Sequence, residues 1–386
     1  MIVKMKDICT KIGSGATPRG GKDAYIDEGI SLIRSQNVID FSFSHDGLTY
    51  INEEQAKKLN GVTVEVDDVL LNITGDSVAR VCIVDNEILP ARVNQHVCIL
   101  RGDKDKVLNS FILYFLQMKK QELLQMASGG ATRNALTKGM IEELEIDLPS
   151  IEEQKKIVST LDSIQEKLKI NNKINRNLLE QALALFFQYY EQASKKESFS
   201  KHIKVLGGGT PKTNEAGYWN GDIPFFTPKD VGTPYTFNTE KNITEEGLAH
   251  CNSRLYPINT TFVTARGTVG KVALAGVPMA MNQSCYALAS DSINPLLVYF
   301  YTIEAVKSLK HKASGAVFDA IVTRDFDTEI IHYLDEQSAD EFVICVTPMM
   351  EQIRRSTIES QKLQKLRNGL LPKLMAGELD VSDLDI

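Results

Sequence analysis

Apolar residues at helical spacing run through the middle of the chain, between Leu148 and Tyr190. Ser150 and Glu153 form a capping box at the start, where acidic side chains suit the positive end of a helix. Beyond it, apolar positions recur in alternating steps of four and three, as in a coiled-coil seam. Two asparagines interrupt the series, and buried amides at such positions fix the register of a helix pair at some loss of stability. The predicted seam consists of Ile157, Leu161, Ile164, Leu168, Asn171, Asn175 and Leu178.

The segments before and after this helix share a series of motifs in the same order. GSGATP at Gly13–Pro18 recurs as GGGTP at Gly207–Pro211, and Asn94-Gln95 recurs as Asn282-Gln283. The strings SLIRSQNV and PFFTPKDV, LLNITGDSVARVCIV and FVTARGTVGKVALA, and ASGGATRNALTKGMI and ASGAVFDAIVTRDF also match in that order. Each half ends with Pro, then Glu-Gln, then a helical pattern. The ordered series indicates an internal repeat.

Each repeat consists of short runs of Val, Ile, Phe and Tyr between Gly, Pro, Asn and Asp, the pattern of strands and turns, with one helical stretch. We predict the α+β class, with two similar globular domains and two long helices that pair. The second helix opens at Pro348, a favoured first-turn residue, and its apolar positions include Leu363, Leu366 and Leu370. The predicted ranges are 1–149 and 193–346 for the domains, 150–192 and 347–377 for the helices, and 378–386 for a tail.

Composition narrows the class of protein without deciding its function. The 386 residues leave room for two or three domains, and 43% apolar with 24% charged residues is typical of globular proteins. No apolar run approaches the roughly 20 residues of a membrane span. Six scattered cysteines without a C-x-x-C pair indicate reduced thiols, so we expect a cytoplasmic protein. The net charge of −7 argues against a stand-alone nucleic-acid binder, unless charge is unevenly distributed or a partner supplies basic surface.

Five segments together carry a resemblance to a known family. They are YWNGDIPFFTPKDV from Tyr218, ARGTVGKVAL from Ala265, the Asn282-Gln283 pair, LPSIEEQKKIV ahead of the central helix, and LRNGLLPKLMAGEL near the end. With these, the chain resembles the specificity subunit of a type I restriction-modification system over essentially its whole length. The resemblance implies two target recognition domains, each recognising half of a bipartite DNA sequence, and an antiparallel coiled coil that sets their spacing. It also implies that this chain is not itself an enzyme.

The resemblance further implies partners and cofactors. Double-stranded DNA and two methylation subunits are expected to bind the chain, with restriction and translocase subunits joining the complex, and no membrane partner is expected. S-adenosylmethionine, ATP and Mg²⁺ are expected in those subunits, for adenine N6 methylation and cleavage of unmodified DNA, and none of them in this chain. The first domain departs from the family pattern, because Thr74-Gly75-Asp76-Ser77 stands where the second has Arg266-Gly267-Thr268. Its DNA target is therefore expected to differ.

The candidate DNA contacts are hydrogen-bond donors and cations in the segments between predicted strands. Arg pairs well with guanine, Asn and Gln with adenine, and Lys, Arg and Thr donate to phosphate. The candidates are Thr17, Arg19, Lys22, Arg34, Gln36, Asn37, Arg80, Arg133, Thr210, Lys212, Tyr218, Trp219, Thr227, Lys229, Arg266, Thr268, Lys271 and Arg324. Other roles remain open: Trp219 packs in a core, or the cations are ordinary surface charges. For the repeated Asn-Gln pairs an architectural role is favoured, because they persist where other segments differ.

Other functional classes fit the sequence less well. The Gly-rich opening lacks the P-loop spacing, since Gly15 lies six residues before Gly21 and Asp23 follows Lys22. No Asp/Asn-Pro-Pro-aromatic motif of an adenine methyltransferase occurs, and His96 and Cys98 lack further metal ligands. We therefore predict no catalytic and no metal-binding residues. The alternatives are a stand-alone two-domain enzyme that cleaves DNA, a specificity subunit of a related methylation-only system, and a coiled-coil protein without a nucleic-acid role.

Overall fold

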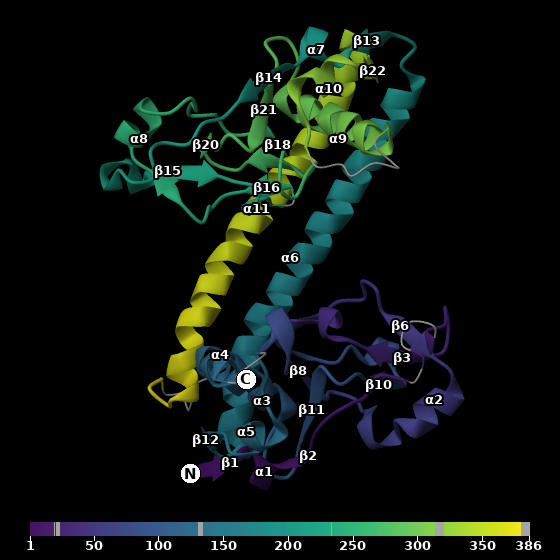
Figure 1. The fold of residues 1–386 in the computed structure, drawn as a ribbon, viewed down its shortest axis with the longest axis vertical. Coiled ribbons are helices and arrows are strands. Elements are labelled where there is room, and N and C mark those ends of the chain that lie inside the picture. The colour runs from purple at the N-terminus through teal and green to yellow at the C-terminus, as the bar shows by residue number, and fades with distance from the viewer. Residues whose placement is uncertain (19, 21–23, 130–133, 233, 313–319, 380–386) are drawn as a thin grey trace. The chain divides into compact units, whose positions relative to one another are not determined.

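The structure of the chain, a computed structural model, describes residues 1–18, 20, 24–129, 134–232, 234–312 and 320–379. The chain divides into two compact units (Figure 1): unit 1 contains Met1–Leu168 and the segment from Leu363 onward, and unit 2 contains Lys169–Lys362. Each unit combines helices with mostly antiparallel sheets, which confirms the predicted α+β class. The two long helices, α6 (Ile151–Gln192) and α11 (Glu336–Met375), each contribute residues to both units.

Unit 1 is built around two four-stranded sheets, in the orders β6-β3-β10-β7 and β2-β11-β8-β9. Its strands are β1 (Ile2–Lys4), β2 (Cys9–Ser14), β3 (Ile30–Ile33), β4 (Val38–Ile39), β5 (Ser42–Phe43), β6 (Thr49–Ile51), β7 (Thr63–Val64), β8 (Val69–Asn72), β9 (Val81–Ile83), β10 (Ala91–Val93), β11 (Val97–Gly102) and β12 (Glu145–Asp147). Its shorter helices are α1 (Met5–Ile8), α2 (Glu53–Lys58), α3 (Asn109–Met118), α4 (Lys120–Ser128) and α5 (Lys138–Glu142), with 3-10 turns at Ser35–Asn37, Asn60–Val62, Gly75–Ser77 and Asn86–Ile88.

The sheet β2-β11-β8-β9 is covered on both faces. Successive side chains of a strand point to opposite faces, so Leu71 of β8 packs with Phe111 of α3, whereas Leu70 packs with Ile33 of the other sheet. This explains why β8 is apolar at almost every position, with only its last residue, Asn72, polar. The result is a helix layer, a central sheet and a second sheet, with one core on each face of the central sheet.

Unit 2 repeats this plan with a five-stranded sheet, β14-β21-β18-β19-β16, and a three-stranded sheet, β17-β15-β20. Its strands are β13 (Lys196–Ser198), β14 (Lys204–Gly207), β15 (Trp219–Phe226), β16 (Tyr235–Thr236), β17 (Asn242–Ile243), β18 (Thr261–Thr264), β19 (Val272–Ala275), β20 (Ala280–Met281), β21 (Cys285–Ala289) and β22 (Ile330–His332). Its shorter helices are α7 (Phe199–His202), α8 (Glu245–Ala249), α9 (Pro295–Lys312) and α10 (Thr323–Asp327), with a 3-10 turn at Ala216–Tyr218. Val263 faces Phe300 of α9 and Phe262 faces Phe226 of β15, as in unit 1.

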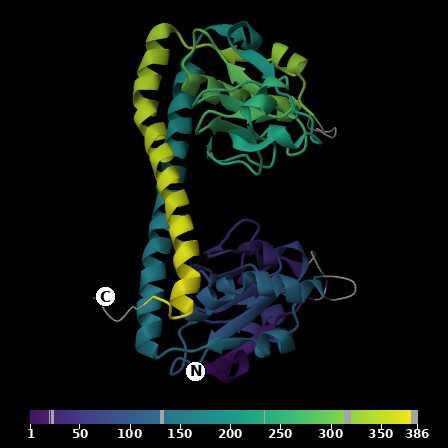
Figure 2. The ribbon, with the colours of Figure 1, turned by 90° about the vertical axis from the view of Figure 1, so that its left-hand side faces the viewer.

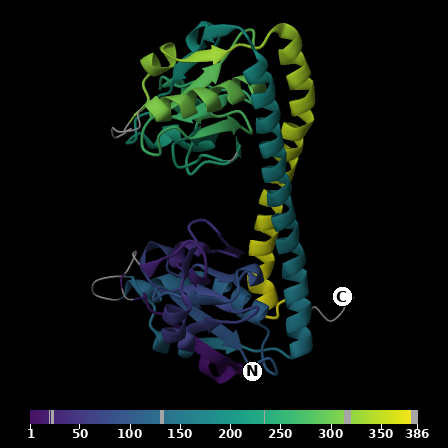
Figure 3. The same ribbon diagram turned by 90° about the vertical axis from the view of Figure 1, so that its right-hand side faces the viewer.

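Within each unit, segments of α6 and α11 pack against each other and run in opposite directions (Figures 2 and 3). In unit 1, Ile157 and Leu161 of α6 share a core with Leu371 and Leu374 of α11. In unit 2, the Phe186 and Phe342 rings lie 5.7 Å apart between centroids. Contacting residues have decreasing numbers along α11 as their numbers increase along α6, so the two helices pair antiparallel.

The two asparagines of the predicted seam lie between α6 and α11 in unit 2. Asn171 is 1% exposed, and its Nδ2 donates to Glu359 Oε2 at 2.9 Å and to Ser360 Oγ at 3.2 Å. Asn175 is half-buried, and its Oδ1 accepts a hydrogen bond from Ser356 Oγ at 2.7 Å. Complementary hydroxyl and carboxylate groups on α11 therefore match both amides. On α6, Ile157, Leu161, Ile164 and Leu168 are buried and Leu178 is half-buried.

On α11 the buried face differs in part from the face that the apolar pattern of the sequence predicts. Leu363 and Leu370 are half-buried, but Leu366 is 50% exposed. Its neighbour Arg367 occupies the buried stripe, where Nη1 donates to Gln165 Oε1 at 2.7 Å and the guanidinium carbon lies 3.8 Å from the Phe41 ring centroid. Burial lowers the pKa of Arg367. The Arg367 guanidinium, which stacks on the Phe41 ring, thus takes the buried place that the periodicity predicts for Leu366.

The second long helix also starts earlier than predicted, at Glu336 rather than at 347. Asp335 caps it, because its Oδ1 accepts the Ser338 backbone N–H at 2.9 Å. Pro348 therefore lies inside the helix, where it removes one backbone donor. The helix tolerates this because the residue one turn earlier, Ile344, is 72% exposed, so water can reach the carbonyl that lacks its partner. Phe342 and Val346, both fully buried, anchor this first part of the helix.

Within the described residues no helix is long and apolar enough to cross a membrane. The six cysteines are free thiols, and three of them, Cys82, Cys98 and Cys285, are buried. Burial raises the pKa of Cys98 to about 12, which keeps this thiol protonated at neutral pH.

Candidate nucleic-acid interface

In unit 1 five loops meet at one edge of the sheets. The register pairs Ser14 with Cys98, Asn72 with Val97, and Ile33 with Val93, so the ends of β2, β8, β3 and β10 meet the start of β11. Four loops leave these strand ends, and a fifth segment joins them because Leu136 N donates to Ile73 O. Together they form what we call the loop edge of unit 1: residues 15–18, 34–37, 73–80, 94–96 and 134–136. Loops held at one edge of a rigid sheet are suited to binding.

Unit 2 builds the same edge. Gly207 of β14 pairs with Tyr286, Thr264 of β18 pairs with Cys285, and Phe226 of β15 pairs with Met281. The loop edge of unit 2 therefore consists of residues 208–212, 227–230, 265–271, 282–284 and 320–322, which are the repeat counterparts of the five loops in unit 1.

Equivalent backbone hydrogen bonds hold the two edges. Asn94 N donates to Ile33 O and Asn282 N to Phe226 O, each at 3.0 Å. Ile73 N donates to His96 O in unit 1, and Ala265 N donates to Ser284 O at the same point of unit 2. In the same way Leu136 N donates to Ile73 O, and Ile321 N donates to Ala265 O. The loop edges of the two units therefore share these three backbone hydrogen bonds, so the internal repeat extends to the loops.

Glycines fix the close approach of two of these loops. A Cβ at Gly15 would lie 1.6 Å from Val93 O, and one at Gly208 would lie 2.2 Å from Asn282 O. Gly75 and Gly267 both adopt positive φ, at 75° and 80°, directly after Thr74 and Arg266. The Gly-rich motifs of the sequence thus serve the close packing of these loops.

Unit 2 presents most of the predicted cations at its loop edge. Lys212, Arg266 and Lys271 are exposed there, and Arg324 is exposed on α10, two residues beyond the edge. None of the four forms an ion pair with another described residue. Lys229 is also exposed, with its ammonium 3.4 Å from Glu240 Oε2. Lys310 lies behind this edge and donates to Gly270 O at 2.7 Å; burial and the nearby Lys271 lower its pKa. Unpaired surface cations of this kind suit phosphate binding.

The polar and aromatic candidates of unit 2 are held by neighbouring groups. Thr227 Oγ1 donates to Asp230 Oδ2 at 2.6 Å, and Thr268 Oγ1 donates to Pro228 O at 3.2 Å. The Tyr218 ring stacks on His250 with centroids 4.9 Å apart. Trp219 Nε1 donates to Lys212 O at 3.1 Å, and its ring meets the Phe225 ring edge-on in a small core. Trp219 is thus half-buried and packs against that small core.

The candidates of unit 1 mostly brace its loops. Asn37 is fully buried: its Oδ1 accepts the Arg34 N–H and its Nδ2 donates to Ser44 O at 2.9 Å, so its predicted role as a DNA contact is corrected to a structural one. Arg34 is half-buried and donates to Gly47 O, and the exposed Gln36 donates to Gly47 O at 3.2 Å. Arg80 is exposed on the loop edge without an ion pair to a described residue. Arg19, Lys22 and Arg133 lie outside the described residues.

The structure divides the repeated Asn-Gln pair into two roles. Asn94 and Asn282 turn the backbone, each accepting at Oδ1 an N–H two residues ahead at 3.0 Å. Gln95 and Gln283 are exposed at the loop edge and accept hydrogen bonds from Thr17 Oγ1 and Thr210 Oγ1. Persistence of the pair in both repeats was the sequence signal, but it does not distinguish a buried amide from an exposed one.

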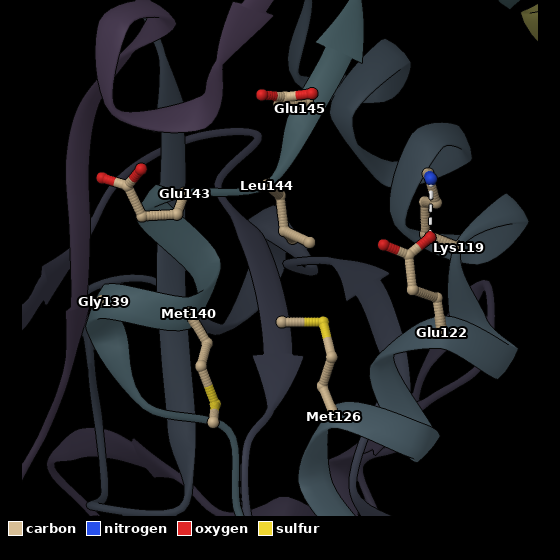
Figure 4. Close-up of a pocket in the computed structure, with 8 residues that line it drawn as sticks. All are labelled: Lys119, Glu122, Met126, Gly139, Met140, Glu143, Leu144 and Glu145. Atoms are coloured by element: carbon tan, nitrogen blue, oxygen red, sulfur yellow. Dashed lines mark hydrogen bonds and ion pairs between the residues drawn. The ribbon is translucent and has the colours of Figure 1, made fainter.

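A groove of about 590 Å³ lies in unit 1 beside α4, α5 and β12 (Figure 4). It is lined by Lys119, Glu122, Met126, Gly139, Met140, Glu143, Leu144 and Glu145. Hydrogen bonds from Lys4 and Lys6 hold the pKa of Glu143 at about 2. The acidic lining does not suit DNA. Among the residues that the structure describes, no group of three or more His, Cys, Asp and Glu side chains is placed to hold a metal ion.

Comparison with known proteins agrees with this architecture. The family model described as type I restriction modification DNA specificity domain matches twice, over residues 1–181 and 183–337. The type I restriction enzyme MjaIX specificity subunit of Methanocaldococcus jannaschii is 24% identical over 99% of this chain and 94% of its own. The EcoR124I/EcoR124II specificity subunit of Escherichia coli is 28% identical over 52% of each chain.

A solved structure supports the fold. The S subunit of a type I restriction-modification system from M. genitalium superposes with a TM-score of 0.61, over 97% of this chain and 95% of that one, at 13% identity. The two family matches cover both units, and their boundary falls within α6. The chain therefore belongs to the family of type I restriction-modification DNA specificity subunits, as its sequence motifs predicted.

Proposed function

We propose that this chain selects the DNA sequence that a type I restriction-modification complex methylates and cleaves, with each unit recognising one half of a bipartite target through its loop edge. One observation carries the proposal: the two loop edges share backbone hydrogen bonds but differ in exposed side chains. Unit 2 presents Arg266, Thr268 and Lys271 where unit 1 has Thr74, Asp76 and Arg80 in the corresponding loop. A common scaffold with different contacts suits two different half-sites.

In this proposal the chain binds and positions DNA but catalyses no reaction. S-adenosylmethionine, ATP and Mg²⁺ act in partner subunits, which methylate adenine at N6 and cleave unmodified DNA. The net charge of −7 supports a shared interface, because the partners then supply part of the basic surface around the duplex.

The paired segments of α6 and α11 are the proposed docking sites for two methylation subunits. Solvent-exposed apolar residues on these helices support this: Ile170 and Ile174 follow one another by one turn on α6, and Ile344 and Leu366 are exposed on α11. Of these, Ile170 and Ile174 are adjacent on one helix face, and contiguous apolar surface of this kind is what a partner protein can cover. The spacing between half-sites is proposed to depend on the same two continuous helices.

The experiment that tests the proposed function is a domain exchange in cells. Residues 1–149 are replaced by the corresponding domain of another specificity subunit, and methylated adenines are mapped across the genome. We expect one half of the methylated motif to change and the other half to stay, since each unit has its own loop edge. Loss of the chain should abolish the motif. Motif changes in both halves, or methylation that persists without the chain, would contradict the proposal.

A further inference from the structure

The inference concerns Gln95 and Gln283, which occupy the same position on the two loop edges. Both side chains are exposed, although the backbone on either side of them is fixed. Asn94 and Asn282 turn the chain at this point. The glycine-rich loop is tied to this turn by Gly15 N, which donates to Asn94 O at 3.1 Å in unit 1, and by Gly209 N, which donates to Met281 O at 3.2 Å in unit 2. An exposed amide on a fixed backbone needs little ordering when it binds.

A threonine hydroxyl orients each glutamine amide. Thr17 Oγ1 donates to Gln95 Oε1, and Thr210 Oγ1 donates to Gln283 Oε1. A carboxamide accepts at oxygen and donates at nitrogen, so the threonine engages the accepting end and leaves the donating end for another partner. No hydrogen bond joins Gln283 Nε2 to another described residue. The amide of Gln283 therefore presents two N–H groups at the surface.

In unit 1 the same amide belongs to a longer hydrogen-bonded chain. Gln95 Nε2 lies 3.0 Å from His96 Nε2, and His96 Nδ1 lies 2.5 Å from Thr74 Oγ1. With the amide nitrogen as donor, the matching arrangement of the imidazole accepts at Nε2 and donates from Nδ1 to Thr74. One N–H of Gln95 is left for a ligand. Unit 2 has Ser284 in place of His96, so it lacks this extension.

We propose that Gln95 and Gln283 are phosphate-anchoring residues, each donating an amide N–H to the DNA backbone at an equivalent point of the two half-sites. The inference rests on the proposed function and goes beyond it, because it separates residues that hold DNA from residues that recognise bases. Phosphate oxygens only accept hydrogen bonds, which matches the free donating end of the amide. A bidentate contact to adenine would use both ends of the amide, and the threonine already occupies one of the two acceptor positions on its oxygen.

The repeat supports phosphate rather than a base as the ligand. The glutamine and its threonine are the same in both units, whereas the 34–37 and 227–230 loops beside them differ. Phosphate is the part of DNA that every half-site shares, and contacts to it set the register of a protein on the duplex. Beside Gln283, the exposed Arg266 donates its backbone N–H to Ser284 O at 3.3 Å, which brings a cation to the same site. The geometry thus makes each Thr-Gln pair a register anchor for its recognition domain.

The first test uses charge, in the complete complex with its methylation subunits. Gln283→Lys places an ammonium where the amide donates, so the slope of log K against log salt should steepen by about 0.9, the value for one additional phosphate contact. Gln121→Lys is the matched control, since Gln121 is exposed on α4 outside the loop edge. Its slope should stay at the wild-type value. Equal slopes for the two lysine variants would overturn the proposal.

The second test removes the donor. Gln283→Ala should weaken binding about tenfold, the scale of a hydrogen bond to a charged group, and by the same factor on target and non-target DNA. The methylated motif and the Tm of the complex should be unchanged. Thr210→Val should weaken binding less, and Thr210→Ser should bind as wild type, because the hydroxyl is retained. Gln95→Ala and Thr17→Val should behave in the same way.

Each other result has a defined meaning. A motif that changes at one base pair would identify a base contact and overturn phosphate anchoring, and so would unaltered affinity. A lower Tm for Gln283→Ala, together with an unchanged salt slope for Gln283→Lys, would show that the glutamine is only structural. If instead the wild-type complex shows no chain-dependent motif, the proposed function itself fails, which is a separate outcome.

Discussion

A half-buried ion pair in unit 2 occupies a site that is apolar in unit 1, which allows a quantitative test of whether the two versions of the site are interchangeable. Lys312 at the end of α9 places Nζ 2.5 Å from Glu329 Oε1, and Glu329 is only 2% exposed. The aligned motifs place Met126 and Leu144 at these positions in unit 1, where both line the groove beside α4. The same site is thus apolar in one repeat and charged in the other. We expect unit 2 to stay folded when its ion pair is replaced by the Met and Leu that unit 1 has at these positions.

The magnitude follows from the exposure of the two side chains. Removing one partner of a buried ion pair costs about 3 to 5 kcal/mol. The Lys312 side chain is 56% exposed, so solvent screens the pair and we expect Lys312→Met to lower the free energy of unfolding by about 1 to 2 kcal/mol. Glu329→Leu should be neutral or stabilising, because Lys312 then returns to water. The double variant should recover most of the loss.

The assay is urea unfolding of the full chain with hydrogen exchange as a local probe. Phe199 N donates to Glu329 O at 2.9 Å, and β13 pairs with β22, so protection at these amides reports on the site. Lys204→Met is the matched control, since its partner Asp291 is 83% exposed and little should change. The reasoning is refuted if Lys312→Met is as stable as wild type, or if the double variant is no more stable than Lys312→Met.

Two further predictions address DNA binding and the helix pair. Arg266→Ala combined with Lys271→Ala should reduce the salt slope of DNA binding by up to about 1.8, or about 0.9 per lost phosphate contact, whereas the same change at Lys204, outside the loop edge, should not. Replacing both Asn171 and Asn175 by Leu should change the free energy of unfolding by less than about 1 kcal/mol, because new apolar burial offsets the lost hydrogen bonds. The same variant should loosen the helix register and yield more than one spacer length between methylated half-sites in mapped genomes, and a single unchanged spacer would show that other residues set it.

Features that depend on local pattern were available from the amino-acid sequence. The series Ile157, Leu161, Ile164 and Leu168 predicts a helix seam because helical geometry alone places these side chains on one face. The ordered motifs likewise gave the internal repeat, the α+β class and the family. The capping box at Ser150 marked the start of α6 within one residue, since Glu153 Oε2 accepts the Ser150 backbone N–H at 2.9 Å.

Features that depend on distant residues were decided by the tertiary structure. Asn37 matched a base-contact pattern, yet Ser44 and Asp46 bury it in a hydrogen-bonded turn. Leu366 continued an apolar pattern, yet Phe41 and Gln165 favour Arg367 in the buried stripe. Likewise, each Asn-Gln pair consists of a turn residue, buried at Asn94 and half-buried at Asn282, and an exposed glutamine. A sequence states which groups can bond, but burial and partners are set by segments far apart in the chain, so only the folded structure determines which groups remain available to DNA.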